Sequence, residues 1–255
     1  MALDWLYLRS DPSSWRRSVK ITILQTGDVP APLRPQFGDY SRMFERMFDS
    51  ISDSFEYDLV VVNANDPLPD PTEMTAIVIT GSPAGVYDDL PWIEPLRQFI
   101  RKAYGAGIPM LGICFGHQIM ADALGGEVRK SEKGWGVGRH NYSVVDRPDF
   151  MADAPESLAI ACSHQDQVIV PPEAAKVILS TPFTPNAGLY YANEKALSFQ
   201  PHPEFKDDYA LALSELRREA LGAEKADRAA ASFSTPSDSD LLSRYIVDFF
   251  RQAVA

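Results

Sequence analysis

One short segment places a cysteine between two glycines directly after an apolar run, and it reads GICFGHQ. Gly112 and Gly116 each stand two residues from Cys114. Glycine provides clearance at a sharp strand-to-helix turn, where larger side chains would clash. Such a turn presents a thiol at the carboxyl edge of a sheet and beside a helix N-terminus, whose dipole favours a thiolate. The segment predicts a nucleophilic Cys114, and a buried structural cysteine is the alternative.

A cysteine nucleophile needs a base and a group that orients the base, and the segment SFQPHPEF contains both residue types. His202 follows an apolar strand predicted at residues 196–200, so it should emerge at an edge of the sheet. Prolines on both sides of His202 stiffen its backbone. Glu204 can accept a hydrogen bond from the ring nitrogen that faces away from the thiol. Taken alone, this segment is equally consistent with a loop that carries a solvated histidine.

Acyl transfer also needs donors for the developing oxyanion, and loss of one donor typically costs about 10²–10³ in rate. The backbone N–H of Phe115, at the start of the predicted helix, is one candidate. A second could come from VITGSPAGVYDD, residues 78–89, where a predicted strand runs into a loop of small residues. An ordinary strand-to-helix turn is the alternative for this loop.

The elements around these residues alternate between strand and helix. Two apolar runs, at residues 57–64 and 75–81, are continuous, as in strands buried on both faces. The alternation predicts an α/β, flavodoxin-like fold with a mixed, largely parallel sheet and helices on both faces. The predicted strands here are 20–25, 57–64, 75–81 and 109–114, and the predicted helices are 38–51, 91–107 and one from 117.

From about residue 127 the predicted strands become shorter, and together they indicate an antiparallel extension of the same sheet. They are 127–130, 140–145, 157–162, 167–170, 175–180, 188–192 and 195–200. The glycines of KGWGVG, residues 133–138, predict a turn. The whole chain, residues 1–255, is predicted to be one domain, with an N-terminal extension at 1–19 and a C-terminal helical segment from about 207 to 255.

Together, GICFGHQ and PHPE resemble the motifs of the class I glutamine amidotransferases, whose triad is Cys-His-Glu. The resemblance runs from about residue 20 to 205, and ILQTG, FGDY, ITGSP and SHQDQV make it most similar to stand-alone members. These are related to the amidotransferase domain of GMP synthetase and to plant γ-glutamyl peptidases. The resemblance implies that Cys114 is the nucleophile, His202 the general base and acid, and Glu204 the orienting carboxylate.

The same resemblance implies further site residues. The family's oxyanion loop usually reads G-G-P or N-G-P, and Gly81-Ser82-Pro83 stands in its place, so the second donor is Gly81 or Ser82. SHQDQV, residues 163–168, matches the segment whose backbone holds the amino acid end of glutamine. The implied substrate contacts are Gln118, His164, Asp166 and Gln167.

Composition excludes several other classes of function. A formal net charge of −11 argues against nucleic-acid binding, which needs a positive footprint. The sequence has neither a membrane-length apolar run of about 18 residues nor a secretory apolar region, so we expect no membrane partner. Two cysteines cannot build a disulfide framework, and a cytoplasmic location follows as the expectation. The histidines and cysteines have no metal-ligand spacing, and no cofactor is predicted.

Four hypotheses for function remain open at this point. The chain could be a glutaminase that passes ammonia to a synthetase in trans, because 255 residues leave no room for an ATP-dependent domain and no P-loop is present. It could instead be a γ-glutamyl peptidase or hydrolase that acts on γ-glutamyl conjugates. A cysteine-type α/β-hydrolase fits less well, because its acid precedes the histidine in the chain, whereas Glu204 follows His202. The fourth hypothesis is a catalytically idle regulatory module.

Overall fold

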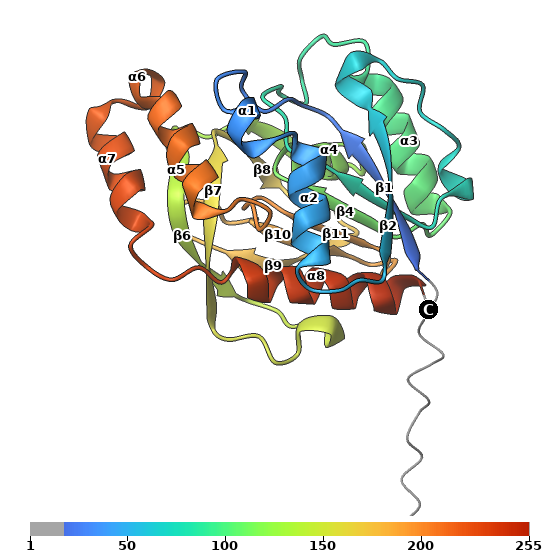
Figure 1. Ribbon diagram of the computed structural model, residues 1–255. Coiled ribbons are helices and arrows are strands. Elements are labelled where there is room, and N and C mark those ends of the chain that lie inside the picture. The colour runs from blue at the N-terminus through green and yellow to red at the C-terminus, as the bar shows by residue number, and fades with distance from the viewer. Residues whose placement is uncertain (1–17, 255) are drawn as a thin grey trace, which may run out of the picture.

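The structure, a computed structural model, describes residues 18–254 and contains a nine-stranded sheet flanked by helices (Figure 1). The strand order is β2-β1-β3-β4-β11-β10-β9-β6-β7. The first five of these strands are parallel to one another and the last four form an antiparallel extension. The predicted α/β fold with a mixed sheet is therefore confirmed.

The strands fall into three groups. The parallel strands are β1 (Val19–Gln25), β2 (Phe55–Val61), β3 (Ala76–Ile79), β4 (Met110–Ile113) and β11 (Ala196–Phe199). The antiparallel strands are β6 (Gly136–Val144), β7 (Ser157–His164), β9 (Ala175–Ser180) and β10 (Gly188–Tyr191). A separate two-stranded ribbon consists of β5 (Glu127–Lys130) and β8 (Asp166–Val170).

Helices cover both faces of the sheet. One face packs against α2 (Tyr40–Asp49) and α8 (Ser239–Val254). The apolar stripes of these two helices meet at Phe48 and Phe250, whose ring centroids are 5.9 Å apart. The other face packs against α3 (Ile93–Gly105) and α4 (Phe115–Ala123). Burial of one large apolar side chain contributes roughly 1.5–3 kcal/mol, so these stripes hold the helices against the sheet.

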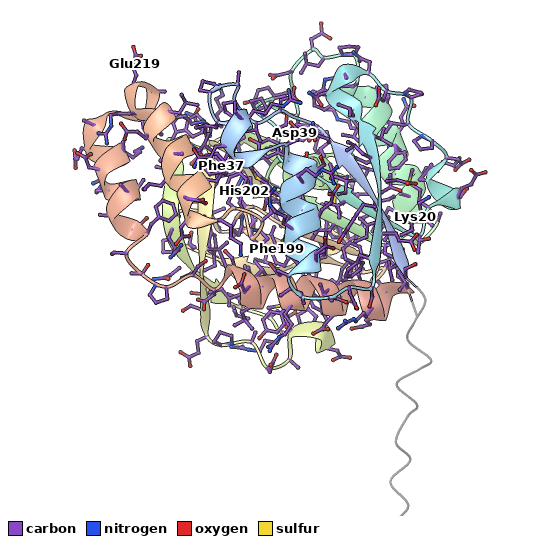
Figure 2. The ribbon with its side chains drawn as sticks, viewed as in Figure 1. Lys20, Phe37, Asp39, Phe199, His202 and Glu219 are labelled. Atoms are coloured by element: carbon purple, nitrogen blue, oxygen red, sulfur yellow. The ribbon has the colours of Figure 1, made fainter. Side chains whose placement is uncertain are left out.

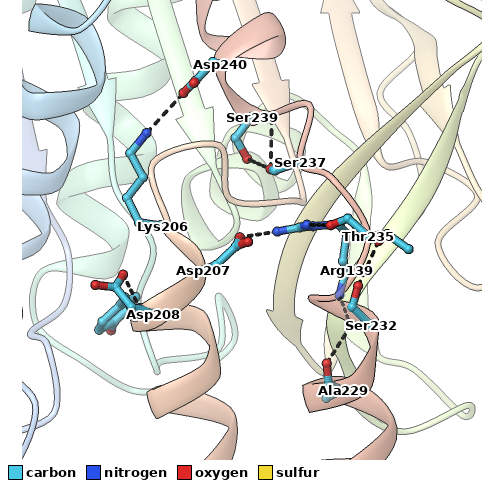
Figure 3. A network of polar contacts seen from close by, with 11 residues as sticks. Arg139, Lys206, Asp207, Asp208, Ala229, Ser232, Thr235, Ser237, Ser239 and Asp240 are labelled. Carbon is cyan, nitrogen blue, oxygen red and sulfur yellow. Dashed lines mark hydrogen bonds and ion pairs between the residues drawn. The ribbon is translucent and has the colours of Figure 1, made fainter.

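Three short helices form a helical insert, residues 207–232, which stands beside β6 and β7 (Figure 1). They are α5 (Asp207–Leu216), α6 (Arg218–Leu221) and α7 (Ala223–Ser232). The side chain of Arg139 in β6, 1% exposed, pairs with Asp207 and donates to the carbonyl of Thr235 (Figure 3). Its backbone N–H donates to Ser232 Oγ at 2.7 Å. These bonds fix the insert to the sheet.

Some predicted details of the sheet are wrong. The run at residues 195–200 does not belong to the antiparallel extension, because β11 pairs in parallel with β4, and its four residues are fully buried between neighbours on both sides. The runs at 127–130 and 167–170 do not join the main sheet, because within residues 18–254 β5 and β8 pair only with each other. Strand order depends on contacts between distant segments, which an apolar pattern does not encode.

Two further corrections concern exposure and a turn. The run at 57–64 is not buried on both faces, because β2 is an edge strand that pairs only with β1, and Leu59 is 50% exposed. The segment 133–138 is only partly a turn, because β6 begins at Gly136 and pairs with β7 from there.

Most of the predicted N-terminal extension, residues 1–19, lies outside the described residues, and β1 already begins at Val19. Within residues 18–254, none of the helices combines the length and the apolar character needed to cross a membrane.

Candidate active site

Cys114 occupies the turn between β4 and α4 in a strained backbone conformation, with φ +54° and ψ −102°. A non-glycine residue held in such a region costs about 1–3 kcal/mol. The flanking glycines make the turn sterically possible. A Cβ at Gly112 would lie 2.5 Å from the carbonyl of Gly116, and a Cβ at Gly116 would lie 2.2 Å from the oxygen of Ile79. The sulfur is thereby held at the first turn of α4.

His202 reaches the same sheet edge because β11 lies next to β4. Phe199, the last residue of β11, accepts a hydrogen bond from the Cys114 N–H at 2.8 Å, and Figure 2 shows His202 above Phe199 near the middle of the molecule. A Cβ at Gly81 would lie 3.2 Å from His202 Cε1 and 3.7 Å from Cys114 Cβ. The ends of β3, β4 and β11 therefore bring these three residues together.

Glu204 completes the arrangement from the loop after β11. Its Oε1 lies 2.7 Å from His202 Nδ1, and both side chains are at most 5% exposed. Because Nδ1 faces the carboxylate, Nε2 is the nitrogen available to the thiol. Burial alone would lower the pKa of His202, but the charges of Glu204 and Cys114 outweigh burial and raise it to about 10.

An aromatic layer fixes the orientation of the imidazole. The ring of Phe205 stacks on His202 with centroids 3.9 Å apart and an interplanar angle of 6°. Tyr209 packs edge-on against Phe205, with ring centroids 4.6 Å apart. Tyr40 also stacks on the ring of Phe205, at 6.1 Å between centroids. Sequence reasoning missed this layer, although Phe205 follows the PHPE motif directly.

The predicted oxyanion donors surround the thiol. Within residues 18–254, the N–H groups of Gly81, Ser82 and Phe115 donate to no protein acceptor. The neighbouring N–H of Gly116 is occupied, since it donates to the carbonyl of Thr80 at 3.1 Å. Free N–H groups at a loop and at a helix start suit a developing negative charge. Both Gly81 and Ser82 remain candidates for the second donor.

A cleft of about 190 Å³ opens above Cys114. Of the predicted substrate contacts, Gln118, His164 and Asp166 line it, whereas Gln167 is 2% exposed and lies outside the lining. Gln118 Nε2 already donates to the carbonyl of Asp166 at 2.8 Å. Burial lowers the pKa of His164 to about 3, so this imidazole is neutral in the cleft.

The cleft also contains residues that sequence reasoning missed. Tyr87 O–H donates to Asp166 Oδ2 at 2.8 Å and so covers one side. Trp135, from the segment predicted as a turn, and Arg217, from the helical insert, line it as well. No motif marked Arg217, and the glycines of KGWGVG were the only signal near Trp135.

Cys162 and His117 do not belong to the arrangement of Cys114, His202 and Glu204. Cys162 is 2% exposed in β7, and burial raises the pKa of its thiol to about 12. His117 is fully buried, its Nδ1 lies 2.8 Å from Ser198 Oγ, and burial lowers its pKa to about 3. In the part of the chain that the structure describes, no three His, Cys, Asp or Glu residues are grouped to hold a metal ion.

The chain belongs to the class I glutamine amidotransferases. The family model described as "Glutamine amidotransferase class-I" matches residues 38–209, more than half of the chain. A glutamine amidotransferase-like protein of Schizosaccharomyces pombe is 30% identical over 90% of this chain and 97% of its own length. Gamma-glutamyl peptidase 2 of Arabidopsis thaliana is 29% identical over 70% of this chain and 73% of its own length.

Two further similarities concern part of a longer protein and the fold. A GMP synthase [glutamine-hydrolyzing] of Trichormus variabilis is 32% identical over 50% of this chain but only 23% of its own length. The crystal structure of a glutamine amidotransferase from Thermotoga maritima superposes with a TM-score of 0.72, covering 93% of this chain and 98% of the other at 21% identity. This last similarity is one of fold.

Proposed function

We propose that the chain is a cysteine-dependent amidohydrolase that cleaves the γ-amide of glutamine and releases glutamate and ammonia. The observation that carries the proposal is the convergence of Cys114, His202 and Glu204 beside free N–H groups at the carboxyl ends of neighbouring strands. A strained cysteine, a buried base and an orienting carboxylate are the parts that nucleophilic acyl transfer requires.

In the proposed reaction, the proton of Cys114 passes to His202 Nε2, whose raised pKa favours the charged imidazole, and the resulting thiolate attacks the γ-carbonyl carbon. The N–H groups of Phe115 and of Gly81 or Ser82 stabilise the oxyanion. The tetrahedral intermediate collapses when His202 gives its proton to the leaving amine, which leaves a γ-glutamyl thioester. Water then loses a proton to His202, attacks the thioester and releases glutamate. The proton returns to the sulfur, and the thiol is regenerated.

The substrate side chain would enter the cleft above Cys114. Gln118, His164 and Asp166 are the proposed contacts for the amino acid end, because they line this cleft. Gln167 is proposed to act only through its backbone, since its side chain is outside the lining.

A γ-glutamyl conjugate is the second candidate substrate, with an amino acid or peptide as leaving group. The observation in its favour is that Trp135 and Arg217 also line the cleft and offer contacts for a leaving group larger than ammonia. The similarity to a gamma-glutamyl peptidase agrees with this candidate.

The ammonia would be used by a synthetase in trans if glutamine is the substrate. The similarity to a GMP synthase suggests such a partner, because half of this chain matches 23% of that protein, and the rest of that protein has no counterpart in the match. We also propose a reducing compartment such as the cytoplasm, since both Cys114 and Cys162 are free thiols.

The test is ammonia release from glutamine by the purified full chain, with and without cell extract, beside Cys114→Ala and Cys162→Ala. We expect Cys114→Ala to lose at least about 10³-fold in rate and Cys162→Ala to stay within about twofold. A glutamine-mimicking electrophile should label Cys114. Labelling of Cys162 alone, or no turnover of any γ-glutamyl amide, would refute the proposal.

A further inference from the structure

The cleft above Cys114 contains an arginine whose charge has no carboxylate partner among residues 18–254. Arg217, between α5 and α6, lines the cleft. Its Nη1 donates to Ser163 Oγ at 2.6 Å, and its guanidinium carbon lies 5.2 Å from the ring centroid of Trp135. Across residues 18–254, no carboxylate oxygen lies within 4.0 Å of its nitrogens.

This situation differs from that of every other described arginine. Each of the others either pairs with a carboxylate, as Arg218 does with Glu215 and Asp227, or donates to a backbone carbonyl, as Arg147 does to Ala154. The chain has 35 acidic and 24 basic residues, so a carboxylate partner is easily found elsewhere. A guanidinium has five N–H donors, and within the described chain only Nη1 of Arg217 has a hydrogen-bond acceptor.

The guanidinium is also held in place before any ligand arrives. Ser163 belongs to β7, and Trp135 directly precedes β6, so two neighbouring strands position it. The helical insert that carries Arg217 is fixed to β6 through Arg139 (Figure 3). A pre-positioned planar fork loses little entropy on binding and suits the two oxygens of a carboxylate.

We infer that Arg217 binds a carboxylate of the substrate, an inference that rests on the proposed γ-glutamyl chemistry. The carboxylate is either the α-carboxylate of the γ-glutamyl group or that of an amino acid leaving group. Arg217 lies beyond residues 38–209, the part matched by the family model, so the helical insert adds this contact to the cleft.

The two sources of the carboxylate are separated by two substrates of equal length, γ-glutamylglycine and γ-glutamylglycinamide. If Arg217 binds the leaving group, Arg217→Gln lowers kcat/KM about 10- to 100-fold for the first substrate and leaves the second within about twofold. If it binds the α-carboxylate, both substrates lose about 10- to 100-fold. Changes within about twofold for both would overturn the inference.

A control variant and a conservative variant accompany this test. Arg218→Gln removes the same charge from the adjacent residue, which pairs at the surface and does not line the cleft, so both substrates should stay within about twofold. Arg217→Lys keeps the charge but loses the planar fork, and we expect an intermediate loss.

A second measurement does not depend on turnover. Iodoacetate and iodoacetamide have nearly the same size, but only the first is an anion, so the ratio of their alkylation rates at Cys114 reports the charge of the cleft. We expect Arg217→Gln to lower this ratio about threefold or more at low salt, and Arg218→Gln to leave it unchanged. An unchanged ratio in Arg217→Gln would overturn the inference. If the wild type hydrolyses neither substrate while the ratio falls, the proposed function fails and the anion contact stands.

Discussion

The clearance around Cys114 leads to a sharp prediction for Gly116→Ala. Gly116 lies in the first turn of α4, and a Cβ there would be 2.2 Å from the oxygen and 2.9 Å from the carbonyl carbon of Ile79. Both atoms belong to the backbone of β3, which is buried within the sheet and cannot swing aside as a flexible side chain could. The start of α4 must therefore move away from β3.

The size of this movement follows from the contact distance. Raising 2.2 Å to 3.0 Å, the lower limit seen for real Cβ contacts, requires a shift of 3.0 − 2.2 = 0.8 Å. Overpacking of this kind costs about 1–3 kcal/mol in the free energy of unfolding. A displacement of about 1 Å at a reacting group can cost about 10²-fold in rate. Because Cys114 directly precedes α4, its sulfur moves relative to His202.

The assay compares Gly116→Ala with Gly105→Ala, at the last residue of α3, where an added Cβ meets nothing within 4 Å. Urea unfolding gives the stability, and ammonia release from glutamine gives the activity. We expect Gly105→Ala to match or slightly exceed the wild type in stability, by up to about 1 kcal/mol. Gly116→Ala with wild-type stability and with activity within twofold would show that the reasoning about this turn is wrong.

Three other perturbations test separate parts of the molecule. Glu204→Gln should lower the pKa of His202. In the wild type, the raised folded-state pKa of His202 stabilises the protein fully below about pH 6.5, and this stabilisation is lost as the pH rises toward about 10. The difference in unfolding free energy between wild type and variant should therefore shrink over that pH window in denaturation experiments, and a constant difference would contradict this. Cys162, whose thiol pKa is about 12, should resist iodoacetamide at pH 9 until urea unfolds the chain, as peptide mapping would detect; labelling in the folded protein would count against its burial. Arg139→Met should detach the helical insert and cost about 1–3 kcal/mol, with faster proteolysis within residues 207–232, whereas an unchanged cleavage pattern would mean that other contacts hold it.

Local chemistry was the predictable part of this molecule. The glycines around Cys114 provide clearance and the prolines around His202 restrict the backbone, so the turns they form can be inferred without knowledge of distant segments. The parallel half of the sheet was predictable because β3 and β4 are continuous apolar runs separated by a helix. The pairing of distant strands was not predictable. For example, the four buried residues of β11 contain no pattern that indicates β4 as the neighbouring strand.

The contacts that orient the imidazole of His202 and that place a charge in the cleft also depend on packing between distant segments. Phe205 is adjacent to the PHPE motif, but its stacking on His202 depends on how the chain turns after β11. Arg217 belongs to a helix pair with no motif, and it reaches the cleft because Arg139 and the apolar contacts of Val137 hold the insert against β6. The residues of the proposed triad are thus specified by short segments, whereas the charge of Arg217 in the cleft is specified by packing between distant elements. If the proposed chemistry holds, a change in the helical insert would therefore alter the charge that meets the substrate and leave Cys114, His202 and Glu204 in place.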